Sequence, residues 1–189
     1  MRTIALLPTL FVLACSSPGP TTTRYLLPTN VPMGTVRMEP PVRVGLDRVD
    51  VAPYLGERGV VVETEVRQVR PARYHQWAEP LSDGLRRFLQ AEISNALGYD
   101  VSDDSRQRAH WDRSIDVIID RLHGNLSGEA KLVARWRVVS EAGVTEAVSY
   151  RFAATEPLPR GGYPGLVDAE ITLVRNLAVA IAESLRGSP

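Results

Sequence analysis

The sequence has only one cysteine, Cys15, so an internal disulfide is impossible and no second thiolate is available for a metal site. It also lacks the serine-hydrolase, zinc-protease, phosphate-loop and dinucleotide-binding signatures. Basic and acidic residues balance at 22 each, with no block of like charge, which gives nucleic-acid binding no electrostatic support. No stretch after the N-terminal segment approaches the length of a transmembrane helix. We therefore predict a protein that is not an enzyme and needs no cofactor or metal.

Cys15 follows a short apolar run that ends in a small residue. The run covers residues 4–14, is preceded by Arg2 and ends at Ala14. This order is typical of a bacterial lipoprotein signal, because a small residue fits the peptidase and the thiolate accepts a diacylglyceryl group before cleavage. The alternative is an ordinary secretory signal with an incidental cysteine. We favour lipidation at Cys15, which would export the mature chain and hold it on a membrane.

The residues around Cys15 also predict how the chain is divided. Residues 1–14 are the signal peptide, and residues 15–23 are the acylated cysteine with a polar, proline-rich linker. Residues 24–187 have the length of one domain. Ser16, not aspartate, follows the cysteine. Because aspartate there usually retains lipoproteins at the inner membrane, we expect the periplasmic face of the outer membrane.

Hydrophobic periodicity predicts the secondary structure of this domain. Alternating or β-branched apolar residues predict strands at residues 25–27, 42–46, 60–66, 115–119, 132–138 and 148–152, with a short antiparallel partner at 73–77. Glycine-containing turns separate the last three strands, which are therefore expected to form a meander. Helical spacing predicts helices at residues 81–97, between Pro80 and Gly98, and at 166–185. The expected fold class is α+β: a mostly antiparallel sheet of about six strands covered on one face by two amphipathic helices.

Polar residues that could carry chemistry are scattered along the chain. His75, His110 and His123 have no serine or carboxylate at a catalytic spacing, so we interpret them as surface or turn residues. Asp112, Asp116 and Asp120 are the best candidates for a carboxylate cluster. They alternate with apolar residues, and a calcium site needs a loop that wraps the ion, so a solvated strand face is the better explanation.

Aromatic residues offer candidates for ligand or partner binding. Trp77, Trp111 and Trp136 could form a ligand box, although Trp136 falls on an apolar face and Trp77 suits a hydrophobic staple before a helix. Tyr54 and Leu55 lie on a proline-restricted turn that would suit docking against a partner. Tyr54, Leu55 and Trp77 are the predicted docking residues, and capping of the core is the alternative.

The order of these segments resembles the PqiC/YmbA family of auxiliary lipoproteins of MCE-type ABC transport systems. After the Cys15 signal come Tyr-Leu-Leu at 25–27, Val-x-Val-x-Leu at 42–46, Pro-Tyr-Leu at 53–55 and an apolar strand from Val60. The most specific segment is Trp-Ala-Glu-Pro-Leu at 77–81. The turn at 56–59 and the charged loop at 100–113 depart from the family pattern.

This resemblance implies a non-catalytic subunit on the periplasmic face of the outer membrane. Its partners would be the membrane, through acylated Cys15, and an MCE-family protein whose rings or tubes carry lipids across the periplasm. An inner-membrane ATPase would supply the energy, and copies of the chain could form a homo-oligomeric ring. The residues alone leave another class open: an envelope assembly or regulatory lipoprotein that chaperones a β-barrel or activates a wall-building enzyme.

Overall fold

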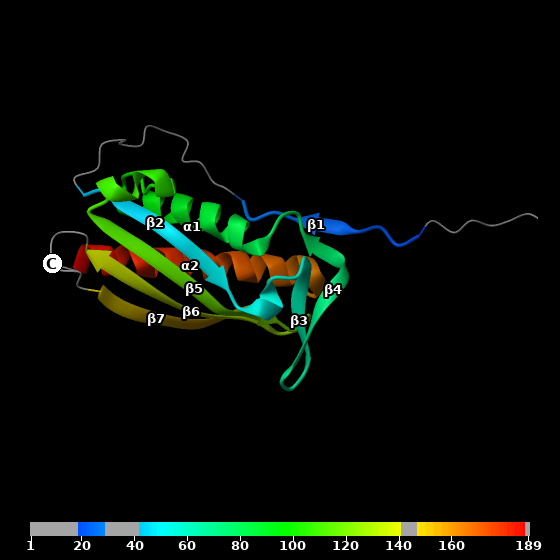
Figure 1. Ribbon diagram of the computed structural model, residues 1–189. Coiled ribbons are helices and arrows are strands. Elements are labelled where there is room, and N and C mark those ends of the chain that lie inside the picture. The colour runs from blue at the N-terminus through cyan, green and yellow to red at the C-terminus, as the bar shows by residue number, and fades with distance from the viewer. Residues whose placement is uncertain (1–18, 29–41, 141–146, 188–189) are drawn as a thin grey trace, which may run out of the picture.

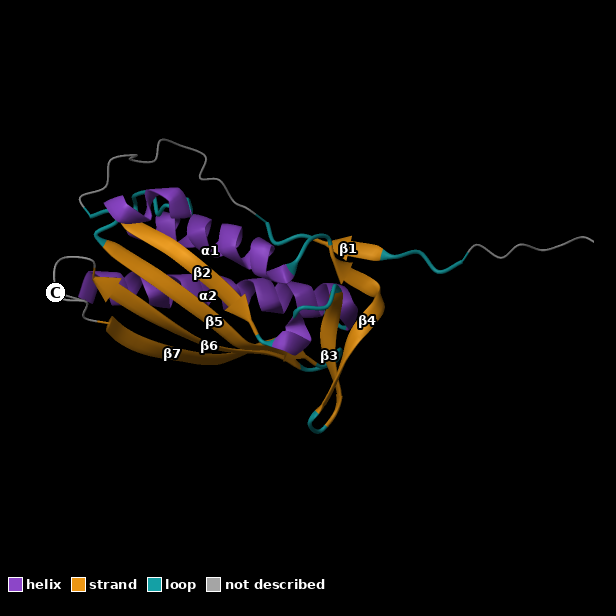
Figure 2. Cartoon of the chain, in the orientation of Figure 1, coloured by secondary structure: helices purple, strands orange, loops and turns teal. Residues whose placement is uncertain are grey.

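The computed structural model describes residues 19–28, 42–140 and 147–187, which form a seven-stranded sheet and two long helices (Figure 1). The strands are β1 (Thr23–Tyr25), β2 (Val44–Val51), β3 (Gly59–Glu65), β4 (Gln68–Trp77), β5 (Arg113–Gly124), β6 (Glu129–Ser140) and β7 (Ala147–Pro157). The helices are α1 (Leu81–Leu97) and α2 (Gly162–Gly187), with short 3-10 helices η1 (Pro53–Leu55) and η2 (Ser105–His110). Both long helices lie on the same side of the sheet (Figure 2).

The sheet is mixed, so the predicted mostly antiparallel sheet of about six strands was wrong. Its order is β1-β4-β3-β5-β6-β7, with β2 paired to β5 off this path. The hairpin of β3 and β4 and the meander of β5, β6 and β7 are antiparallel, whereas β1 runs parallel to β4 and β2 parallel to β5. Apolar alternation reports which face of a strand is buried, but it does not encode the direction of the neighbouring strand.

The predicted meander is present, and one of its faces forms the core beneath the helices. Opposing residues of β5 and β6 on this face are buried: Ile115 with Val138, Val117 with Trp136 and Ile119 with Ala134. From the helices, Phe88 of α1 and Leu173 and Leu177 of α2 are completely buried. Each large apolar side chain removed from water contributes about 1.5–3 kcal/mol. The core therefore lies between one face of the sheet and the two helices.

Helix α1 has the boundaries that the sequence predicts. It begins after Pro80, whose φ of −53° is compatible with a helix start, and ends at Leu97. Gly98 adopts a left-handed φ of +80°, and its N–H donates to the carbonyl oxygen of Ser94 at 2.9 Å. Glycine suits this position because a Cβ disfavours positive φ.

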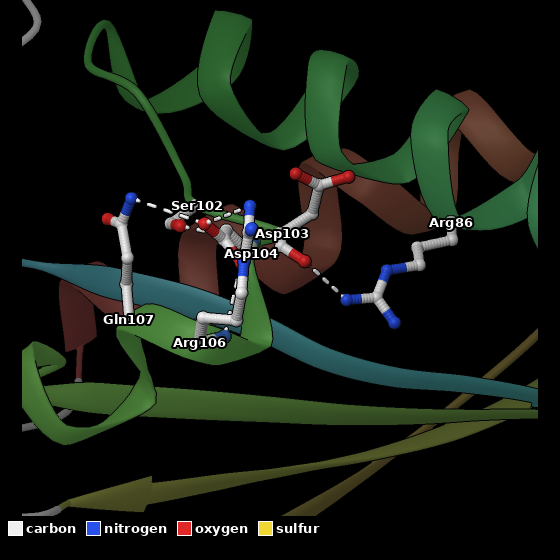
Figure 3. A network of polar contacts seen from close by, with 6 residues as sticks. All are labelled: Arg86, Ser102, Asp103, Asp104, Arg106 and Gln107. Carbon is white, nitrogen blue, oxygen red and sulfur yellow. Dashed lines mark hydrogen bonds and ion pairs between the residues drawn. The ribbon is translucent and has the colours of Figure 1, made fainter.

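The charged segment between α1 and β5 is held by its own polar contacts (Figure 3). Asp104 caps η2: its carboxylate accepts a hydrogen bond from the Arg106 backbone N–H at 3.1 Å and from the Arg106 Nε at 2.9 Å. Arg86 of α1 donates to the carbonyl oxygens of Asp103 and Asp47. Arg86 thus joins α1 to this segment and to β2.

Trp111 closes this segment over β2 and is only 4% exposed. Its indole ring lies directly against Gly45, where an added Cβ would be 2.0 Å from a ring carbon. Backbone bonds from Ser102 to Val44 and Leu46 hold the adjoining chain in place. Only glycine leaves room for the ring at this position of β2.

Candidate docking site

A groove of about 360 Å³ opens where the β3–β4 hairpin meets the end of β5. It is lined by Tyr54, Glu63, Val66, Arg67, Val69, Asp120, Arg121 and His123. We call this the hairpin groove. The fold builds it from three separate segments: η1, the β3–β4 hairpin and the last residues of β5. Figure 1 shows the hairpin projecting beyond the body of the sheet.

The floor of the hairpin groove is aromatic and uncharged. The Tyr54 hydroxyl and the His123 Nδ1 share a hydrogen bond of 2.9 Å, and the two rings meet edge to face. His123 is buried, and this burial is the main reason that its pKa is lowered, so the imidazole is neutral at physiological pH. Burial also raises the pKa of the Tyr54 hydroxyl, which stays protonated. The pair therefore presents a neutral surface.

The outer wall of the hairpin groove is apolar and exposed. Val66 is 84% exposed and Val69 is 42% exposed, both at the hairpin tip. Arg67 completes the turn with a φ of +68°, and it lines the groove together with the charged residues Glu63, Asp120 and Arg121. An apolar centre with a polar rim is the usual anatomy of a protein–protein interface. The arrangement suits docking.

The predicted docking residues occupy different places in the structure. Tyr54 lines the hairpin groove, and Leu55 next to it is a core residue that is 1% exposed. Trp77 is 5% exposed and ends β4, at the opposite end of that strand from the hairpin tip. The structure gives Leu55 and Trp77 packing roles, and a docking role for them stays a prediction. Cys15 lies outside the described residues.

The two exposed valines were missed by the sequence interpretation. Val66 was taken as the last residue of a strand, and Val69 was not singled out. Their exposure could have been predicted, because an apolar residue directly beside a hairpin turn often lies beyond the helices that cover the sheet. The sequence could not show that this hairpin extends past the helices.

The aspartates considered as a carboxylate cluster do not converge. Asp112 pairs with Arg43 at 3.0 Å, and Asp120 with Arg135 at 3.4 Å. Asp116 lies between Arg48 and Arg137, at 3.5 and 2.7 Å. Within residues 19–28, 42–140 and 147–187, no three His, Cys, Asp or Glu side chains are grouped to hold a metal ion.

The three tryptophans also stay apart. Trp111 covers Gly45, whereas Trp136 stacks on Tyr150 with 5.2 Å between ring centroids. The Trp136 Nε1 donates to the Ser184 hydroxyl of α2 at 3.0 Å. Each is a core residue with its own neighbours, and they do not form a ligand box.

Glu170 of α2 is a further residue that the sequence interpretation missed. It is 1% exposed, and neither carboxyl oxygen has a hydrogen-bond partner among the described residues. Burial raises its pKa well above the usual range of a glutamate. Its position, four residues after Leu166 and three before Leu173, is on the buried side of the helix. The helical spacing already contained this signal.

The described residues thus form a mixed sheet, two long helices on one side of it and the hairpin groove. The chain belongs to the family of ABC-type transport auxiliary lipoprotein components, which matches residues 25–182. This confirms the resemblance seen in the sequence. In the part of the chain that the structure describes, no helix has the length and apolarity needed to cross a membrane.

Solved structures share this fold. One uncharacterized protein is 24% identical, with a TM-score of 0.71 over 87% of this chain and 99% of its own. Protein XCC0632 from Xanthomonas campestris is 12% identical, with a TM-score of 0.64 over 84% of this chain and 92% of its own. No curated protein matches the sequence.

Proposed function

We propose that this chain is a non-catalytic auxiliary subunit of an MCE-type ABC lipid-transport system. Acylated Cys15 would anchor it to the periplasmic face of the outer membrane, with residues 15–23 as the linker and 24–187 as the docking domain. The hairpin groove would hold the MCE protein that conducts lipids across the periplasm. The energy would come from the ATPase of the transporter.

Membership of the auxiliary lipoprotein family over residues 25–182 is the observation that carries this proposal. An auxiliary component must contact another subunit, so it needs an exposed surface whose burial is favourable. The hairpin groove offers one, with Val66 and Val69 exposed beside a neutral Tyr54–His123 floor. A few residues near the centre of an interface commonly carry most of its binding energy.

Placing a carboxylate at each exposed valine should weaken docking. We expect the double variant Val66→Asp, Val69→Asp to lose about tenfold or more of its affinity for the proposed MCE partner, because burying a carboxylate in an apolar contact is unfavourable. Pull-down in detergent, followed by titration with the purified partner, measures this loss.

A matched control tests whether the loss of affinity depends on where the carboxylate is placed and is not caused by the added charge alone. Val179→Asp changes a valine of α2 that is 44% exposed and is not a lining residue of the hairpin groove. It should bind like the unmodified protein. Equal losses in both variants, or no association of the unmodified protein in detergent, would contradict docking at this groove.

The anchor is tested separately with Cys15→Ser. We expect the variant to keep its signal peptide and to lack the acyl mass, because the thiolate is the only group that can accept the diacylglyceryl chain. The unmodified protein should gain the mass of the lipid and sediment with outer-membrane vesicles. A native protein with a free thiol, or an N terminus elsewhere, would overturn the anchoring.

The alternative class is an envelope assembly or regulatory lipoprotein, and the fold alone does not distinguish it from a transport subunit. It differs in its partner: a β-barrel or a wall-building enzyme should then be recovered in the pull-down in place of an MCE protein. An adjacent barrel or synthase gene would favour it, and an adjacent MCE protein with an ABC permease would favour transport.

We also propose that copies of the chain form a ring. The 11 residues of β7 lie at one end of the sheet order, and in the described chain this strand pairs only with β6. An outer strand can add a strand from another molecule. Light scattering of the acylated protein in detergent should give a multiple of the monomer mass.

A further inference from the structure

A second groove, of about 590 Å³, lies along the middle of β4 beside the first residues of α2. Arg70, Pro71, Ala72, Arg73, Tyr74, His75 and Tyr163 line it. We call it the tether groove. The pairing of β3 with β4 is irregular here: Val61 stands opposite Pro71, but Gly59 stands opposite Gln76, so the intervening residues of β4 leave the regular ladder. This irregularity makes room for the groove.

The chain that leads back to Cys15 enters the fold at this groove. Thr23, the first residue of β1, is the register partner of His75. Figure 1 shows the described residues before β1 leading away from the body at this end. Seven residues lie between Cys15 and Thr23, and the eight steps from one Cα atom to the next span at most about 28 Å when the chain is fully extended. An acyl anchor at Cys15 would therefore keep the tether groove within that distance of the bilayer.

The lining of the tether groove is basic and aromatic. Arg70 and Arg73 are exposed, none of the lining residues is acidic, and neither arginine forms an ion pair with another described residue. The Arg73 guanidinium lies over the Tyr74 ring, 5.3 Å from its centroid. By contrast, arginines on the open face of the sheet, such as Arg137, are already paired with aspartates. The tether groove thus has uncompensated positive charge.

Stacked rings make one wall of this groove rigid. The His75 ring stacks on Tyr163 with 4.0 Å between centroids, and the His75 Nδ1 shares a 2.9 Å hydrogen bond with the Tyr25 hydroxyl. These contacts join β1, β4 and α2 at one point. Arginines bind phosphate oxygens, and tyrosines are frequent at the level of lipid headgroups because they are apolar with a polar end.

We propose that the tether groove binds the phosphate-bearing headgroup of an anionic lipid in the membrane that holds Cys15. Arg70 and Arg73 contact the phosphate, and Tyr74 and Tyr163 pack against the glycerol region. The inference rests on the proposed function in one respect, the acyl anchor. A lipid anchor alone leaves the domain free to rotate on its linker, whereas a second contact fixes which side faces the membrane. The hairpin groove, at the start of β4, then points in a constant direction.

The test uses the acylated full protein in nanodiscs of phosphatidylcholine, with or without phosphatidylglycerol. Hydrogen exchange should be slower in the anionic discs over residues 70–75 and 162–166 than elsewhere in the domain. Each arginine near an anionic surface contributes about fivefold to the occupancy, so the effect should weaken strongly at high salt. The double variant Arg70→Glu, Arg73→Glu should exchange equally in both discs.

Arg106→Glu is the matched control, because Arg106 is an exposed arginine of η2, between α1 and β5, and does not line the tether groove. It should keep the lipid-dependent slowing. The headgroup site would be overturned if the unmodified protein exchanged equally in both discs, or if the slowing survived in the Arg70→Glu, Arg73→Glu variant. Equal exchange in both discs is also the result expected if the tether groove binds a protein partner. Mass spectrometry first verifies the acyl chain; its absence would instead overturn the proposed anchor, and this inference with it.

Discussion

Replacing Gly45 with alanine is expected to destabilise the domain by about 3 kcal/mol, the upper end of the usual cost of overpacking a core. The added Cβ would lie 2.0 Å from a carbon of the Trp111 ring, which is not the flexible end of a side chain. The indole must therefore leave its site or β2 must move away from it. Urea unfolding of both proteins, followed by circular dichroism, measures the difference in the free energy of unfolding.

Two further variants show whether the ring causes this loss. Gly187→Ala adds the same methyl group where nothing lies within 4 Å except the adjoining backbone of its own helix, so its effect should be small. In a Trp111→Ala background, which is itself destabilised, Gly45→Ala should cost much less, because the obstructing ring is gone. A cost that is unchanged in this background would mean that the contact with Trp111 does not limit position 45.

The second large effect concerns the buried carboxyl of Glu170. Burial raises its pKa in the folded protein well above the usual 4.5, whereas the unfolded chain keeps the usual value. Its contribution to stability is therefore complete below pH 4.5 and is lost as the pH rises towards the folded pKa. Across that interval the free energy of unfolding falls by about 1.4 kcal/mol per pH unit from this group.

Glu170→Met should remove both the pH dependence and the unpartnered polar group. We expect it to be more stable than the unmodified protein by about 2 kcal/mol at pH 7.5, and by less at pH 5. Glu170→Gln should also flatten the pH dependence, with a smaller gain because the amide stays unpartnered. Thermal or urea unfolding from pH 4 to 8 provides the measurement. Curves that run parallel for all three proteins would contradict a protonated, buried Glu170.

Sequence patterns predicted the elements that depend on local periodicity. Helix α1 was predicted at 81–97 because apolar residues recur at helical spacing between Pro80 and Gly98, and the structure confirms it. The three-strand meander was predicted because glycine turns separate alternating segments, and it is also confirmed. Both features are decided within a short stretch of chain.

Long-range pairing was less accessible to sequence reasoning. The parallel pairing of β2 with β5 joins Leu46 to Ile115 across the whole of β3, β4 and α1. Nothing in the alternation of either strand specifies that partner. For the same reason, the sequence placed Tyr54 on an accessible turn but could not bring it to His123, 69 residues away.

Glu170 illustrates a different limit. Its burial could have been predicted, because it shares the helix side of Leu166 and Leu173, but a search for catalytic spacing passes over an isolated carboxyl. The Tyr25–His75–Tyr163 stack could not have been predicted, because its members come from three elements that meet only in the folded chain.

The parallel alignment of β1 with β4 determines how the molecule would respond to mechanical force. A pull on the chain ahead of Thr23, directed along the strand axis, acts on β1 lengthwise. The three register pairs from Thr23 to Tyr25 would then be sheared together and would not open one after another like a zipper. Tension from a moving bilayer would thus be resisted collectively at this junction before it reached the helices.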